Sequence, residues 1–101
     1  MDVNRYTYEY KTVAYINWKN TITFINRKMD AILFGEIKWT GKPVGTDIYE
    51  SLKQKASRVS WGTNTRKERY CLFSKTGFTD AMLKAARNDD VLLFQEGTLL
   101  T

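Results

Sequence analysis

Two charged residues, Glu36 and Lys38, lie two positions apart in the stretch FGEIKW, which spans residues 34–39. The residues around them are apolar and typical of a strand. Because side chains alternate across a strand, Glu36 and Lys38 share one face with Phe34. At a strand end such a pair can reach a cleft, where the carboxylate could hold a divalent cation and the ammonium could orient water or steady a phosphate. The alternative is an exposed ion pair on a half-solvated sheet, which contributes ~0–1 kcal/mol.

The chain contains no histidine, which excludes His-based triads and most zinc sites. Any metal would be held by oxygen atoms, so Mg²⁺ or Mn²⁺ is the cofactor to consider. The single cysteine, Cys71, cannot form an internal disulfide, and we expect it to be a small core residue of a cytoplasmic protein. No apolar run approaches the ~20 residues of a membrane span, so we expect no membrane association.

Basic residues are concentrated in the middle of the chain. The net charge is +5, and residues 38–75 contain nine basic and three acidic side chains. Such a surplus suits a polyanion, although an ordinary solvated face is an equally good interpretation. The candidate nucleic-acid contacts in and just after the charged strand are Lys42, Lys53, Lys55, Arg58, Trp61, Arg66 and Lys67.

Three tryptophans, Trp18, Trp39 and Trp61, could stack on bases. Trp61 lies in the basic loop SWGTNTRKE and is the best candidate for stacking. For Trp39, at the end of the charged strand, we expect packing in the core or at an interface.

Apolar patterning and turn residues predict seven elements that would position these side chains. Strands are expected at 6–16, 21–25, 31–39, 69–75 and 91–95, and helices at 46–57 and 79–87. Thr46 and Thr79 are the expected N-caps of the two helices. The last residues, EGTLLT, fit no element.

The predicted order β-β-β-α-β-α-β describes one α/β domain over residues 1–101. The first three strands would form an antiparallel meander, and the later strands would be parallel and flanked by helices in a mixed sheet. If Asn26 faces Ala31 across the hairpin, Thr21 faces Glu36 and Thr23 faces Phe34.

Two blocks of this chain, ILFGEIKWTGKPV and LFSKTGFT, resemble the C-terminal domain of archaeal and bacterial AAA-type ATPases, long catalogued as an uncharacterised archaeal ATPase domain. The resemblance covers roughly residues 20–96. That family is placed in the PD-(D/E)xK, or restriction-endonuclease-like, superfamily, and the resemblance therefore implies an endonuclease-like core. The ATPase module itself is not present, because no GxxxxGK[ST] motif occurs.

The resemblance implies that Glu36 and Lys38 are the catalytic (D/E)xK pair, with Glu36 as a ligand of Mg²⁺ or Mn²⁺. It also implies an acidic residue on the preceding strand, where this sequence has Thr21 or Thr23 instead. Asp30 is a candidate second metal ligand, but it lies in the turn, about 20 Å from Glu36 along a straight strand. Glu9 and Glu50 are further candidates.

The sequence therefore supports three hypotheses for function. The first in rank is a nuclease-fold domain that binds nucleic acid with an incomplete catalytic site. The second is an active Mg²⁺-dependent endonuclease, and the third is a regulatory or protein-interaction domain. The expected partner is nucleic acid, and an ATPase module or a second copy of the chain are further candidates.

Overall fold

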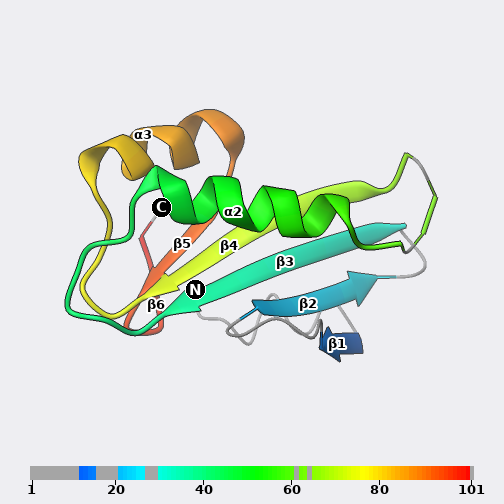
Figure 1. The fold of residues 1–101 in the computed structure, drawn as a ribbon, viewed down its shortest axis with the longest axis horizontal. Coiled ribbons are helices and arrows are strands. Elements are labelled where there is room, and N and C mark those ends of the chain that lie inside the picture. Colours follow the sequence, from blue (N-terminus) through cyan, green and yellow to red (C-terminus); the bar gives the residue numbers. More distant parts are fainter. Residues whose placement is uncertain (1–11, 16–20, 27–29, 61, 64, 101) are drawn as a thin grey trace.

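The computed structural model describes residues 12–15, 21–26, 30–60, 62–63 and 65–100. These residues form an α/β fold with a mixed sheet and two helices (Figure 1). The elements along the chain are β1 (Thr12–Tyr15), β2 (Thr21–Asn26), β3 (Ala31–Lys38), α2 (Thr46–Ser57), β4 (Lys67–Ser74), α3 (Asp80–Asp89), β5 (Leu92–Gln95) and β6 (Thr98–Leu99).

The sheet keeps the order of the chain, β1-β2-β3-β4-β5-β6. The first three strands are antiparallel neighbours, β3–β4 and β4–β5 are parallel, and β6 returns antiparallel to β5. The predicted meander and parallel pairs are confirmed within the described residues. The final strand β6 was not predicted, because two strand residues after the turn at Glu96 and Gly97 leave little alternation to recognise.

The register of the β2–β3 hairpin is as predicted. Asn26 pairs with Ala31, Thr23 with Phe34, and Thr21 with Glu36. Asp30 completes the turn with φ 51°, in the left-handed region that aspartate tolerates better than most residues. The Glu36 side chain therefore lies beside the positions on β2 where the resemblance implies a carboxylate.

Both helices lie at their predicted places, but only one cap is as expected. Thr79 caps α3 by accepting a hydrogen bond from the Met82 N–H at 3.2 Å. The prediction that Thr46 caps α2 was wrong: the cap is Gly45, which is extended at φ −102°, and Thr46 is already helical. No side chain caps the α2 amino terminus.

The two helices cover the same face of the sheet, as Figure 1 shows, and enclose the larger core. Tyr49, Leu52 and Ala56 of α2 are buried there. The opposite face carries a second buried cluster. Its members are Ala31, Leu33, Cys71, Leu92 and Phe94, so the prediction of a core position for Cys71 is confirmed.

Trp39 was predicted to pack and does not. Its side chain is 58% exposed, because β3 ends at Lys38 and the chain leaves the sheet there. Neither of the described helices is long and apolar enough to cross a membrane.

Candidate functional site

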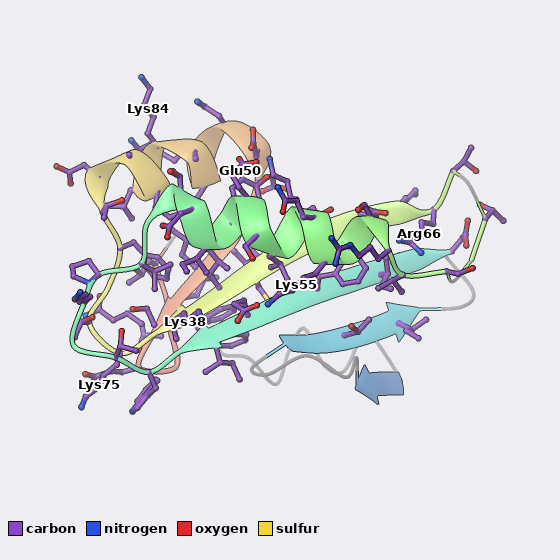
Figure 2. The ribbon with its side chains drawn as sticks, in the orientation of Figure 1. Lys38, Glu50, Lys55, Arg66, Lys75 and Lys84 are labelled. Atoms are coloured by element: carbon purple, nitrogen blue, oxygen red, sulfur yellow. The ribbon has the colours of Figure 1, made fainter. Side chains whose placement is uncertain are left out.

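Glu36 is the most buried charged residue of the described chain, with 2% of its surface exposed. It lies on the helix-covered face of β3, next to Leu72 of β4. Lys55 reaches down from α2 and places its Nζ 3.0 Å from Glu36 Oε1, and Lys38 Nζ lies 3.7 Å from Oε2. Figure 2 shows Lys38 and Lys55 on this side of the sheet. The interpretation of Glu36 and Lys38 as an exposed surface pair is therefore wrong.

The helix α2 holds Lys55 over the carboxylate. The neighbouring Ala56 and Leu52 are fully buried against the sheet, which fixes the rotation of the helix about its axis. Lys55 thus lies at the edge of the packed face and is 25% exposed, while Lys38 is 33% exposed. Two ammonium groups around one carboxylate leave this Glu36 cluster (Glu36, Lys38 and Lys55) with one surplus positive charge, open to solvent on the lysine side.

The described residues around Glu36 offer few oxygen ligands for a divalent cation. An ammonium group already lies on Oε1, at a distance where a metal ion would compete with it for the same oxygen. Thr23 is buried one pair along the hairpin and provides only a neutral hydroxyl, a poor ligand for Mg²⁺. Among the described residues, no three Asp, Glu, His or Cys side chains gather to hold a metal.

The other carboxylates proposed as metal ligands lie elsewhere or outside the described residues. Asp30 is at the opposite end of β3, and its carboxylate accepts hydrogen bonds from the backbone and hydroxyl of Thr63. Glu50 is 61% exposed on α2 and pairs with Lys53 at 3.0 Å. Glu9 lies outside the described residues. The structure therefore brings neither Asp30 nor Glu50 to Glu36.

Arg66 is committed to the carboxyl-terminal end of α2. Its Nη1 donates to the carbonyl of Val59 at 2.7 Å, and its Nη2 donates to the carbonyl of Ala56 at 3.1 Å. Its Nε pairs with Glu68 at 2.9 Å, and the guanidinium lies 5.7 Å from the centre of the Phe34 ring. With 9% of the side chain exposed, Arg66 satisfies helix carbonyls and closes the core.

The remaining predicted contacts are scattered. Lys53 lies across α2 from Lys55, with its ammonium 4.3 Å from the centre of the Tyr49 ring. Arg58 is the exposed C-cap of α2, and Lys67 is exposed at the start of β4. Trp61 and Trp18 lie outside the described residues. The described members of the predicted set thus come from both ends of α2, from the helix itself and from the start of β4.

A pocket of about 190 Å³ opens at the other end of α2, where β3 leaves the sheet. Lys38 lines it from the strand and Lys42 from the following loop. Asp47, in the first turn of α2, is the one acidic residue among the lining residues. Lys38 belongs both to the lining of this pocket and to the Glu36 cluster.

The loops after β3 (residues 39–45) and after β4 (residues 75–79) run side by side; we call them the strand-end loops (Figure 1). Hydrogen bonds join them along their length: Lys75 N to Lys38 O at 3.3 Å, Thr76 Oγ1 to Thr40 O at 3.1 Å, Val44 N to Gly77 O at 2.9 Å, and Thr79 N to Val44 O at 3.0 Å. The β3–β4 pairing ends at Lys38 and Ser74, and it brings the beginnings of the two loops together. The paired strands 31–39 and 69–75 were the signal for this proximity.

The turn after β4 is built from its own residues. The Ser74 hydroxyl, fully buried, donates to the Gly77 carbonyl at 2.7 Å and accepts from the Gly77 N–H at 3.0 Å. Gly77 has φ 97°, in the region that favours glycine, and a side chain there would meet Gln95. The turn therefore holds the strand-end loops in one arrangement.

Burial raises the pKa of three groups among the described residues. Burial raises the pKa of the Cys71 thiol to about 12, so it is protonated and unreactive at neutral pH. The pKa values of Tyr49 and Tyr70 are also raised, first by burial and then by hydrogen bonds to Asp89 and Glu68. None of these groups is activated for catalysis.

No family model, curated protein or solved structure was found to match this chain.

Proposed function

We propose that this chain is a nuclease-fold domain that binds nucleic acid and does not cleave it. The observation that carries the proposal is the Glu36 cluster. A buried carboxylate on the third strand of the sheet is held by two lysines, so an internal ammonium takes the place that a metal ion needs. The three side chains of the Glu36 cluster together carry one net positive charge, and no metal ion is needed to supply it.

The fold and the resemblance support the same interpretation. The mixed sheet, in which a meander is followed by parallel strands, supports the proposal, and the endonuclease-like core that the FGEIKW block implies is itself part of the proposal. In an active site of that kind, a second carboxylate would be needed near Glu36, and the hairpin register brings Thr21 and Thr23 to this place. Lysines that could contact phosphate lie close to Glu36, whereas no second carboxylate lies there among the described residues.

Phosphate contacts would come from lysines at the amino-terminal end of α2. Lys42 and Lys75 are exposed on the strand-end loops, and Lys38 lines the pocket together with Lys42. Ammonium groups attract the phosphates of any sequence, and the affinity they supply falls with salt. We do not assign a phosphate contact to Arg66, because its donors serve the helix end.

Fluorescence anisotropy with a labelled oligonucleotide tests the binding. The expected result is an affinity that falls with salt, and a salt slope that drops by about one for each contacting lysine removed, in Lys42→Ala and Lys75→Ala. Lys84→Ala is the matched control, because Lys84 projects from α3 away from the strand-end loops (Figure 2). Absence of binding, or equal losses in the control, would contradict the proposal.

A cleavage assay with Mg²⁺ or Mn²⁺ tests the second half of the proposal. Single- and double-stranded substrates should remain intact at metal concentrations that saturate ordinary nucleases. Metal-dependent cleavage that disappears in Glu36→Gln would instead establish the active endonuclease, with Glu36 as its metal ligand.

A further inference from the structure

We infer that the exposed indole of Trp39 is a stacking platform for an unpaired base, so that the ligand of this domain is single-stranded nucleic acid. The inference rests on the proposed function and names its substrate class.

The exposed indole of Trp39 has no packing role among the described residues. Among the described residues, Trp39 and Leu100 are the large hydrophobic side chains that remain exposed, and Trp39 is the more exposed of the two, at 58% against 40%. An indole in water contributes little to the core, whereas the preceding residues of β3 from Ala31 to Glu36 are all buried. The ring therefore presents its aromatic surface to a partner.

The backbone that carries Trp39 is held in place. Lys38 and Ser74 are the last paired residues of β3 and β4, and the Lys75 N–H donates to the Lys38 carbonyl just before Trp39. Beyond it, Thr40 accepts a hydrogen bond from the Thr76 hydroxyl. An aromatic side chain on an anchored backbone loses little conformational entropy on binding, which favours its use as a contact.

Lysines flank Trp39 in sequence and on the neighbouring loop. Lys38 precedes it, Lys42 follows it on the same loop, and Lys75 begins the neighbouring loop. Asp47 lines the adjoining pocket and Glu36 pairs with Lys38, so the three lysines face two carboxylates and leave one surplus positive charge. An exposed aromatic ring next to lysines is a combination that binds single strands, with bases stacked on the ring and phosphates on the cations.

The geometry of nucleic acids explains why the ligand should be unpaired. In a duplex, each base is stacked between its neighbours, and its face is closed to a side chain. In a single strand, a base can turn out and stack on an indole, in a contact that tolerates any sequence. A platform of this kind therefore separates single strands from duplexes, whereas lysines alone do not.

The experiment uses the variant Trp18→Phe/Trp61→Phe, in which Trp39 is the one remaining tryptophan. Oligothymidylate should quench its fluorescence, and an abasic oligonucleotide with the same number of phosphates should not. In the otherwise unchanged chain, Trp39→Ala should weaken oligothymidylate binding by at least about fivefold, the lower end of measured stacking losses. Trp39→Phe should retain part of that affinity, and abasic and duplex binding should be unchanged in both variants.

The outcomes separate the two proposals. If nucleic acid binds through the lysines but Trp39→Ala weakens abasic, duplex and single-stranded ligands equally or not at all, the platform is wrong and the proposed function stands. If no nucleic acid binds to the unsubstituted chain, both are overturned. Thermal unfolding followed by circular dichroism checks each variant, and the exposure of Trp39 predicts an unchanged midpoint.

Discussion

The two ends of α2 use basic side chains in opposite ways. At the carboxyl-terminal end, Arg66 is largely buried, donates to the carbonyls of Ala56 and Val59, and pairs with Glu68. It lines a pocket of about 250 Å³. At the amino-terminal end, Lys42 is exposed and Lys38 lines the smaller pocket. Both belong to the same basic stretch of sequence. The comparison teaches that a charge surplus does not identify a binding surface until the internal uses of each cation are known.

The helix dipole explains part of this difference. The last carbonyls of a helix carry partial negative charge and need donors, which a guanidinium between strand and helix provides. Lys55, between the two ends, is also used internally, because its ammonium balances the buried Glu36. The predictions below separate cations that hold the fold from those that remain available to a ligand, and they run from the largest expected effect to the smallest.

Lys55→Ala should have the largest effect. It removes the ammonium 3.0 Å from a carboxylate that is 2% exposed, and we expect a loss of about 3 kcal/mol in the free energy of unfolding. Urea denaturation measures it. Lys53→Ala is the matched control on the same helix, since its pair with Glu50 is exposed and should contribute less than about 0.5 kcal/mol. Equal losses of unfolding free energy in the two variants would show that the Lys55–Glu36 ion pair contributes no more than an exposed pair.

Arg66→Ala should follow, with a loss of about 2 kcal/mol, because the carbonyls of Ala56 and Val59 lose their charged donor. Lys67→Ala, at the next and exposed position, is the control and should leave the urea midpoint unchanged. Nucleic-acid affinity should be the same in Arg66→Ala, measured at a temperature where it is folded. A loss of nucleic-acid affinity without a loss of stability would show that Arg66 contacts the ligand and does not hold the helix end.

Alkaline pH should weaken the fold through buried acids. The pKa of Cys71 rises from its ordinary value of 9.0 to about 12 in the fold, so below pH 9 the thiol is protonated in both states and has no effect. Above pH 9 the unfolded chain loses the proton first, and stability should fall by about 1.4 kcal/mol by pH 10 from this group alone. The raised pKa of Tyr70, whose hydroxyl donates to Glu68 near Arg66, acts in the same direction.

Cys71→Ala isolates the thiol in this experiment. Urea denaturation at a series of alkaline pH values should show a shallower decline for the variant, by about one proton between pH 9 and the folded pKa of about 12. Parallel curves for the two proteins would mean that the thiol ionises normally and is not enclosed.

Lys42→Ala should have the smallest effect on stability, less than about 0.5 kcal/mol, because the side chain is exposed at the amino-terminal end of α2. The same substitution should lower nucleic-acid affinity. A destabilisation as large as that of Arg66→Ala would abolish the difference between the two ends of the helix.

The elements and their pairing were largely predictable, because they depend on local patterns. Alternation and turn residues located β2, β3 and both helices, and the hairpin count gave the Thr21–Glu36 register. Where a prediction was wrong, the cause was a feature of the tertiary structure. The residue type of Trp39 predicts a core position, but β3 ends at Lys38 and the indole remains exposed.

The residues Glu36 and Lys38 were predictable from the sequence, but the burial of the site and its further ion pair were not. Glu36 and Lys38 were recognised from their spacing, yet the burial of Glu36 depends on α2 passing above it. The role of Lys55 required the rotation of the helix, which no spacing rule provides. The role of Arg66 required the carbonyls of a helix end that lies seven to ten residues earlier in the chain.

The sequential order of the sheet has a consequence for how the protein folds. Each strand pairs with the strand before or after it in the chain, and none is inserted between earlier neighbours. The chain between two paired strands is therefore only one hairpin turn or one helix with its loops. These short separations lower the contact order and favour rapid folding. As the chain leaves the ribosome, each new strand can join the exposed edge, so the sheet can grow in step with synthesis.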